Sequence, residues 1–199
     1  MTRILLIRHG SNDLLGRVLY GRMPGVHLNP EGALQARNLA QELKKYYALD
    51  AIVSSPLERA LETAQPIAEA QNKPLVTDEG ITELDFGCWA GQSFEKLYET
   101  DYWRNFNRQR SLNWPSDGES LMEVQTRAWR SISVAAERYG DDSTVAMVTH
   151  GDVIRSVLLL VLGMAIDHIH RLEVAPTSVS EILVGEHQPT VRRVNQIFY

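Results

Sequence analysis

Short apolar runs recur along the chain at the spacing expected for buried strands. Residues 3–7 (RILLI), 51–55 (AIVSS) and 144–149 (TVAMVT) are almost continuously apolar. Such runs are typical of parallel strands that are covered on both faces, because neither side needs polar residues. We therefore expect these three segments to lie in the interior of one sheet.

The segments between these runs have the periodicity of amphipathic helices. Asn29-Pro30-Glu31 predicts a helix start, with a capping side chain, a first-turn proline and an acid near the positive end of the dipole. Its expected apolar face comprises Leu34, Leu39, Leu43 and Tyr46. Ser55 and Glu58 predict a capping box for a second helix. Lys73-Pro74 predicts where that helix ends.

Two further helices complete the alternating pattern. A long amphipathic helix is expected from Asp117 to Gly140, and another from Asp152 onward. The segment 179–199 alternates more weakly and predicts a β-hairpin. The chain is thus predicted to form an α/β three-layer sandwich with a mainly parallel central sheet flanked by helices and closed by that hairpin.

Length and irregular composition bear on domain organisation. The chain has 199 residues, which suits a single domain over 1–199. Residues 75–115 are rich in aromatic and acidic side chains, and we expect them to form loops and one or two helices as a small helical cap. Their aromatic residues could form an apolar pocket wall or an ordinary core.

Charge and cysteine usage exclude several classes of function. The formal net charge of −5 argues against general nucleic-acid binding, which requires a positively charged surface. The longest apolar stretch, 157–166, is too short to cross a bilayer and predicts a buried helix. No signal for export is recognisable at the N-terminus, and Cys88 has no partner cysteine, so a cytoplasmic location is expected. Neither nucleic acid nor membrane is an expected partner, and a homodimer stays an open alternative.

Cationic side chains follow the predicted strands at the point where each ends. Residues 1–22 contain four arginines and one aspartate, which favours a small anionic ligand. Arg8-His9-Gly10 follows the first strand, Arg59 lies just after the second, and Thr149-His150-Gly151 follows the third. Ligands in open α/β sheets bind beyond the carboxyl ends of the strands, where helix N-termini favour anions. Two arginines and two histidines meeting there would suit a phosphoryl group, although each side chain alone could be a solvated rim residue.

Five segments, in order along the chain, resemble motifs of the histidine phosphatase superfamily, the phosphoglycerate mutase-like group. They are LLIRHG, SSPLERALETA, ITELDFGCWAG, PSDGES and VTHGDVIR. The resemblance implies that His9 attacks phosphorus and forms a phosphohistidine, while Arg8, Arg59 and His150 hold the phosphoryl oxygens. It also implies that Glu83 protonates the leaving oxygen and then activates water.

These roles set requirements on protonation and on cofactors. His9 must be neutral to attack, and Arg8 and Arg59 would favour the neutral form. Glu83 must be partly protonated, which predicts a raised pKa and a mildly acidic to neutral optimum. No metal and no cofactor are expected, since the arginines supply positive charge. The expected substrate-binding residues are Arg8, Asn12, Gly21, Arg59 and Gly151.

The sequence departs from the family pattern after the first motif. Leu15 stands where many members have asparagine, although Asn12 could still donate to phosphate. Arg22 and His27 are expected to contact the distal part of the substrate. Two other features carry less weight: His168 and His170 could ligate a metal if they lay on a strand, and Cys88 is expected to be packed.

The segment between the third and fourth motifs is shorter than in related mutases, where it closes over the site. Water would therefore be excluded less fully from the phosphohistidine in this protein. Hydrolysis of a small phosphorylated metabolite by a phosphomonoesterase is therefore the favoured function. A phosphomutase (isomerase) of the phosphoglycerate mutase type stays an alternative. A non-catalytic phosphate-ligand sensor is the alternative from another class, and the natural substrate stays open.

Overall fold

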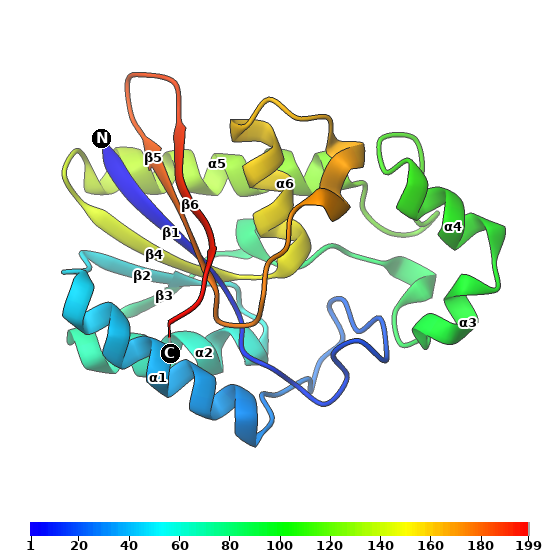
Figure 1. Ribbon diagram of the computed structural model, residues 1–199, viewed down its shortest axis with the longest axis horizontal. Coiled ribbons are helices and arrows are strands. Elements are labelled where there is room, and N and C mark those ends of the chain that lie inside the picture. The colour runs from blue at the N-terminus through cyan, green and yellow to red at the C-terminus, as the bar shows by residue number, and fades with distance from the viewer. Residues whose placement is uncertain (199) are drawn as a thin grey trace.

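A computed structural model describes residues 1–198, and its central feature is a mixed β-sheet (Figure 1). Within those residues the sheet has six strands in the order β3-β2-β4-β1-β5-β6. The four strands β3, β2, β4 and β1 are parallel, and β5 and β6 continue the sheet in antiparallel pairing. The strands are β1 (Thr2–Arg8), β2 (Ala51–Ser54), β3 (Leu75–Thr77), β4 (Thr144–Thr149), β5 (Val179–Val184) and β6 (Thr190–Gln196).

Helices cover both faces of the sheet, which confirms the predicted α/β sandwich. Helices α1 and α2 pack on one face and α5 and α6 on the other (Figure 1). The helices are α1 (Pro30–Tyr46), α2 (Glu58–Gln71), α3 (Phe94–Tyr98), α4 (Asp101–Arg108), α5 (Leu121–Tyr139) and α6 (Gly151–Val161). Short 3₁₀ turns occupy Glu79–Ile81, Gly87–Trp89 and Ile166–Arg171. None of the helices described is long and apolar enough to cross a membrane.

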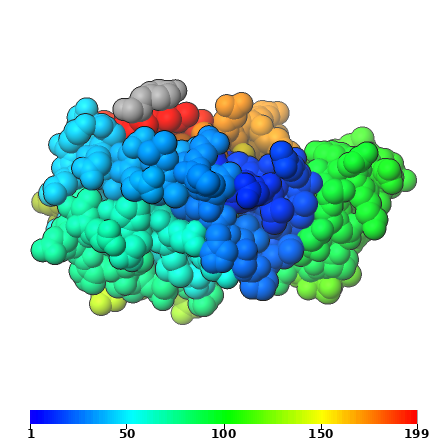
Figure 2. Space-filling model, turned by 90° about the horizontal axis from the view of Figure 1, so that it is seen from below, coloured from blue at the N-terminus to red at the C-terminus, as the bar shows by residue number. Residues whose placement is uncertain are grey.

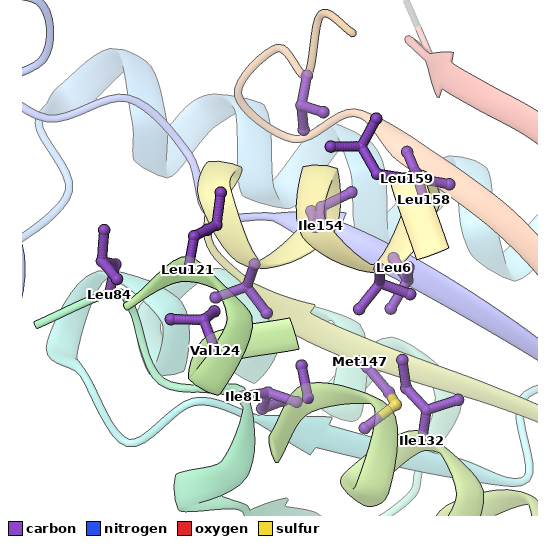
Figure 3. Packing of buried hydrophobic residues seen from close by; sticks show 14 of the residues in the cluster. Leu6, Ile81, Leu84, Leu121, Val124, Ile132, Met147, Ile154, Leu158 and Leu159 are labelled. Atoms are coloured by element: carbon purple, nitrogen blue, oxygen red, sulfur yellow. The ribbon is translucent and has the colours of Figure 1, made fainter. Parts of the chain in front are cut away.

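Strand β1 shows why its sequence is apolar at successive positions. Ile4 and Leu6 pack with α5 and α6, whereas Leu5 and Ile7 pack with α1 and α2, and all four are at most 1% exposed. Side chains alternate between the two faces of a strand, so a strand covered on both sides needs apolar residues throughout. Figure 3 shows Leu6 within the cluster that α5 and α6 complete.

Two of the helices begin further along the chain than predicted. Helix α2 begins at Glu58 with Leu57 at its cap, and no side chain caps it. Helix α5 begins at Leu121, where Ser120 and Glu123 form the capping box, while Asp117 accepts a hydrogen bond from the Cys88 backbone. In α1, Asn29 caps as predicted by accepting from the Gly32 amide.

The apolar face of α1 differs from the prediction at both of its ends. Leu34 is 51% exposed and Tyr46 is 67% exposed, so neither belongs to the buried face. Ala36 and Ala40 lie there instead, beside Leu39 and Leu43. Small residues at these positions let the helix approach the sheet closely.

The middle of the chain contains two short helices, α3 and α4, as expected, and one strand that was not. Leu75–Thr77 form β3 at the sheet edge, too short for its periodicity to be recognised. The assignment of a cap to about residues 75–115 stays a prediction, with these three residues belonging to the sheet. Cys88 is exposed rather than packed.

The C-terminal hairpin was predicted correctly, apart from Tyr199, which lies outside the described residues. The apolar stretch 157–166 is helical only as far as Val161, because Gly163 turns the chain with φ of 65°. Leu160, on the outer face of the last turn, and Leu162, just after it, are more than 40% exposed, while Leu158 and Leu159 are fully buried.

Candidate active site

The three predicted motif ends meet because β1, β2 and β4 are adjacent and parallel. Arg8 lies opposite Thr149 in the sheet, and the His9 amide donates to the Thr149 carbonyl at 3.0 Å. The Ser55 amide donates to the Val148 carbonyl at 2.9 Å. All three carboxyl ends thus open onto one site, as expected for ligand binding in a parallel sheet.

His9 is buried in a form suited to nucleophilic attack. Its Nδ1 lies 2.8 Å from the Gly10 carbonyl oxygen, and its side chain is 1% exposed. A carbonyl can only accept, so Nδ1 carries the proton and Nε2 keeps its lone pair. Burial first, and then the Arg59 and Arg8 guanidinium groups, hold the pKa of His9 well below its usual value.

Arg59 joins the two histidines. Its Nε donates to His9 Nε2 at 3.3 Å, and its Nη2 lies 3.3 Å from His150 Nδ1. Nη2 also donates to the Gly21 carbonyl at 2.7 Å, and the guanidinium lies 4.7 Å from the ring centroid of Tyr20. The side chain is fully buried, so its orientation is fixed before any ligand arrives.

His150 is placed by its other ring nitrogen. Its Nε2 lies 2.7 Å from Ser55 Oγ, and its ring centroid lies 5.3 Å from that of His9. Burial first, and then Arg59, hold the pKa of His150 well below its usual value. Ser55, which the sequence suggested as a helix cap, accepts from the Leu57 amide at 3.4 Å and also contacts this site histidine.

Glu83 lies near His150, with Oε2 at 4.0 Å from His150 Nδ1. Its side chain is buried, and Oε1 accepts from the Leu84 amide at 2.9 Å. Burial first, and then the negative charge of Asp152, raise the pKa of Glu83 to about 7. This agrees with the raised pKa expected from the sequence.

Two arginines position the backbone of Glu83 by donating to its carbonyl oxygen. Arg22 Nε donates to the Glu83 carbonyl at 2.7 Å, and Arg127 Nη2 donates to the same oxygen at 3.1 Å. Both arginines also pair with Glu119. The expectation that Arg22 contacts the distal part of a substrate has no support in this arrangement, because its Nε donates to the Glu83 carbonyl and its Nη2 donates to Glu119.

His27 also lies away from this cluster. It is exposed and pairs with Glu62 on α2, which raises the pKa of His27, chiefly through their hydrogen bond. The expectation that His27 contacts the substrate has no support in this arrangement. The motif position alone could not show that a carboxylate on α2 would bind it.

Three buried nitrogen donors near His9 have no hydrogen-bond acceptor: Arg8 Nε, Asn12 Nδ2 and Arg59 Nη1. Arg8 is anchored by Nη1, which donates to the Val174 carbonyl at 2.6 Å. Asn12 is anchored by Oδ1, which accepts from the Leu14 amide at 3.0 Å. Buried donors without acceptors are costly, so this arrangement is expected where a ligand supplies the acceptor.

Gly151 and Gly21 lie in the same pocket for different reasons. A Cβ on Gly151 would lie 3.5 Å from Arg8 Nε and 3.2 Å from Arg155 Nη1, so glycine leaves these groups room. Gly21 has φ of 45°, a conformation that favours glycine, and presents its carbonyl to Arg59.

The site opens into a cavity of about 290 Å³. The loop after β1 and the segment that carries α3 form part of its wall, and they are joined where Phe94 N donates to the Arg17 carbonyl. Figure 2 shows this loop (dark blue) beside that segment (green). Lining residues outside the predicted site include Leu15, Phe94, Trp103, Arg110, Asp152, Arg155 and His170.

The sequence does not mark Arg110 or Arg155 as members of the pocket, and it suggested His170 only as a metal ligand. Arg110 follows α4 in the irregular middle segment, where no motif marks it, and it binds Asp152 in the first turn of α6. His170 lies on a 3₁₀ turn rather than a strand and contacts Asn107. Among residues 1–198, no group of three or more His, Cys, Asp and Glu side chains is arranged to hold a metal ion.

Comparison with known proteins agrees with the geometry. Residues 4–197 match the model of the histidine phosphatase superfamily (branch 1). The chain is 33% identical over 202 residues to a bifunctional protein of Mycobacterium tuberculosis, covering all of this chain and 55% of that protein. It thus spans about half the length of the first curated relatives it matches.

Other relatives match over nearly their whole length. Phosphoserine phosphatase 1 of Hydrogenobacter thermophilus is 29% identical, with 98% of this chain and 92% of that protein covered. A phosphoserine phosphatase of Entamoeba histolytica, solved with phosphoserine, has a TM-score of 0.86 at 29% identity, covering 98% of this chain and 97% of that one. Bacillus stearothermophilus YhfR has a TM-score of 0.89 at 28% identity, with 96% of each chain covered. The chain belongs to the histidine phosphatase superfamily.

Proposed function

We propose that the protein is a phosphomonoesterase that hydrolyses a small phosphorylated metabolite through a phosphohistidine at His9. The observation that carries the proposal is the set of unpaired buried donors, on Arg8, Asn12 and Arg59, around the unprotonated Nε2 of His9. A phosphoryl group supplies acceptors for these donors and an electrophilic atom for that nitrogen. Of these donors, Arg8 lines an open cavity, together with Glu83 and Gly151.

In the first step, Nε2 of His9 forms a bond to phosphorus as the bond from phosphorus to the ester oxygen breaks. Glu83 gives its proton to the departing oxygen, so an alcohol leaves and Glu83 becomes a carboxylate. Arg8, Arg59 and His150 hold the nonbridging oxygens while their charge shifts. The raised pKa of Glu83 supports this role, because it leaves a protonated fraction near neutral pH.

In the second step, water attacks phosphorus from the side that the alcohol has left. Glu83 takes a proton from this water as the bond between phosphorus and His9 Nε2 breaks. Inorganic phosphate leaves, His9 is neutral again, and Glu83 is protonated again. The positive charge for both steps comes from arginine, so we propose that no metal takes part.

Names of relatives support hydrolysis. Two of them, from Hydrogenobacter thermophilus and Entamoeba histolytica, are called phosphoserine phosphatases and match this chain over nearly all of its length. A reducing compartment such as the cytoplasm is also proposed, since Cys88 is the chain's single cysteine and is an exposed free thiol.

The proposal is tested by phosphate release from a panel of alkyl phosphates and one aryl phosphate. Wild type should turn over the aryl phosphate and at least one alkyl phosphate, and His9→Ala should lose both activities. His187→Ala is the matched control, because that histidine is exposed on the turn between β5 and β6. Turnover that survives in His9→Ala, or phosphate binding without turnover of any ester, would overturn it.

A further inference from the structure

We propose that Thr63 on α2 and Gln35 on α1 are positioning residues, which keep the proton of His9 on Nδ1 by holding the backbone that follows it. This role rests on the proposed function, because attack on phosphorus needs the Nε2 of His9 without a proton. Neither Thr63 nor Gln35 lines the catalytic cavity. Each acts through the chain just after β1 and touches neither substrate nor reacting atoms.

The Gly10 carbonyl is the acceptor that decides where the His9 proton lies. Its oxygen is 2.8 Å from Nδ1 of His9. The peptide between Gly10 and Ser11 is trans. In a trans peptide the C=O and N–H groups lie in one plane and point in opposite directions. The direction of the Ser11 N–H therefore fixes the direction of the Gly10 carbonyl.

Gln35 holds the Ser11 N–H in place. Its Oε1 accepts from the Ser11 amide at 3.0 Å, and its Nε2 donates to Glu31 Oε1 at 3.0 Å, one turn earlier on α1. An amide N–H can only donate and a carboxylate can only accept, so these two contacts prevent the Gln35 amide from turning over. The Ser11 carbonyl is fixed as well, because it accepts from the Asn29 amide at 3.1 Å.

Thr63 holds the preceding peptide group from α2. Its hydroxyl donates to the Arg59 carbonyl at 2.7 Å, so its oxygen accepts from the Gly10 amide, at 3.0 Å. Thr63 is fully buried, and removal of its hydroxyl would leave the Gly10 amide without a partner. Helix α2 thus acts on both nitrogens of the His9 ring, through Arg59 at Nε2 and through Thr63 at Nδ1.

The backbone of Gly10 and Ser11 has little room to rearrange. A Cβ on Gly32 would lie 2.0 Å from the Ser11 carbonyl oxygen, so the first turn of α1 packs directly on this segment. The direction of the Gly10 carbonyl is therefore set before any ligand binds.

The contact at Nδ1 gains importance during the proposed reaction. Arg59 Nε donates to Nε2 of His9 at 3.3 Å and so also favours the unprotonated nitrogen. When Arg59 donates to phosphoryl oxygens instead, the Gly10 carbonyl alone holds the tautomer. As Nε2 bonds to phosphorus, the ring gains positive charge, and the same carbonyl stabilises the Nδ1 proton. Loss of this contact should slow phosphoryl transfer more than it weakens phosphate binding.

The first test uses variants that lose one polar group and keep their shape. Thr63→Val and Gln35→Met should each lower kcat/KM for an aryl phosphate by about 5- to 20-fold. The inhibition constant of inorganic phosphate should change by less than about 2-fold. Thr63→Ser keeps the hydroxyl and should retain at least about half of the wild-type kcat/KM.

Two matched controls come from exposed helix positions. Thr126→Val and Gln65→Met remove the same groups on α5 and α2. Thr126 donates to the carbonyl one turn earlier, and Gln65 donates to a glutamate one turn later, so each makes the same kind of local contact away from the site. Both variants should have the wild-type kcat/KM.

The second test locates the proton and needs no turnover. Correlation spectra of the ¹⁵N-labelled imidazole show which nitrogen carries the proton, and the His9 signals are those missing in His9→Ala. At pH 8 the wild type should carry it on Nδ1. Exchange of this proton with solvent should be at least about 10-fold faster in Thr63→Val and in Gln35→Met.

A proton on Nε2 of His9 in the wild type would overturn the proposal. So would equal losses of kcat/KM in Thr63→Val and Thr63→Ser, or unchanged kcat/KM and unchanged exchange in Thr63→Val and Gln35→Met. If Thr63→Val does not fold, Gln35→Met and the wild-type spectrum still decide the question.

The two proposals fail in different ways. An enzyme that turns over the aryl phosphate equally well in wild type, Thr63→Val and Gln35→Met contradicts only this inference. A protein that turns over no ester contradicts the proposed function, and the role in catalysis that rests on it, whatever the spectra show.

Discussion

The hydroxyl oxygen of Ser55 lies 2.7 Å from Nε2 of His150, and both side chains are fully buried. This contact fixes the imidazole so that its other nitrogen, Nδ1, lies 3.3 Å from Arg59 Nη2 and 4.0 Å from Glu83 Oε2. A hydroxyl can donate or accept, so Ser55 can serve the neutral ring and also the cation that a bound phosphate dianion would favour. Ser55 is therefore a positioning residue for His150.

Replacing Ser55 by alanine should slow turnover without removing it. The ring of His150 would keep its burial and lose the partner that sets its orientation and proton, so kcat should fall by about 10-fold. The measurement is kcat and KM for an aryl phosphate across pH 5 to 9.

The matched control is Ser54→Ala, which removes a buried hydroxyl from the neighbouring position. Ser54 Oγ donates to the Ser55 carbonyl and does not contact His150. If the two variants have the same kcat and the same pH profile, Ser55 only fills space.

Glu83 should set the basic limb of the pH profile. Because its pKa is raised to about 7, its acid form declines above neutral pH, and kcat/KM for an alkyl phosphate should fall there. Glu83→Gln should lower turnover of the alkyl phosphate by about 10² to 10⁴-fold. With an aryl phosphate, whose leaving group needs no proton, the rate of phosphoryl transfer to His9 should fall far less in this variant.

Burst-phase kinetics separate that first step from hydrolysis of the intermediate. Glu99→Gln, an exposed carboxylate in the same part of the chain, is the control and should behave as the wild type. If kcat/KM of Glu83→Gln for the alkyl phosphate still fell above neutral pH as in the wild type, Glu83 would not be the acid.

The same raised pKa predicts an effect on stability. The folded state binds the Glu83 proton more tightly than the unfolded state, so this group lowers the free energy of unfolding as pH rises from about 4.5 to about 7. Between pH 4.5 and pH 8, the free energy of unfolding of Glu83→Gln should therefore rise relative to that of the wild type by about 3 kcal/mol.

The variant must be compared with the wild type because His9 and His150 change the free energy of unfolding with pH in the opposite direction to Glu83. Their lowered pKa values make the wild type lose stability as pH falls below about 6.5. Urea unfolding at both pH values measures the difference, in which the two histidines cancel. A difference that does not change with pH would contradict the raised pKa of Glu83.

Removal of divalent metals should leave activity unchanged. The phosphoryl oxygens are proposed to be held by Arg8, Arg59 and His150, and arginine stays charged at all accessible pH values. Prolonged dialysis against EDTA should therefore leave kcat for an aryl phosphate within error. Loss of activity that added magnesium or zinc restores would show that positive charge from arginine is insufficient.

The inner site could be predicted because its residues follow from topology. His9, Arg59 and His150 lie just beyond parallel strands, and parallel strands bring their carboxyl ends to one edge of the sheet. These residues lie within the family motifs, and the apolar runs that precede the motifs indicate strands.

Features that depend on a distant partner could not be predicted. Ser55 has the signature of a helix cap and accepts from the Leu57 amide, but only the folded position of His150 shows that the same hydroxyl contacts that histidine. Arg110 carries no motif, and its orientation depends on Asp152, which lies 42 residues away along the chain. The hydrogen bonds from Arg22 to Glu83 and Glu119 could not be foreseen from its motif position.

A covalent phosphoryl group on His9 is the central claim, and trapping it is the most direct test. Glu83→Gln, mixed with a ³²P-labelled aryl phosphate and quenched in alkali, should accumulate label that is stable to alkali and labile to acid. Peptide mapping should locate the label at His9, and the additional replacement His9→Ala should abolish it. Phosphate release without any label, or label at another residue, would contradict the account.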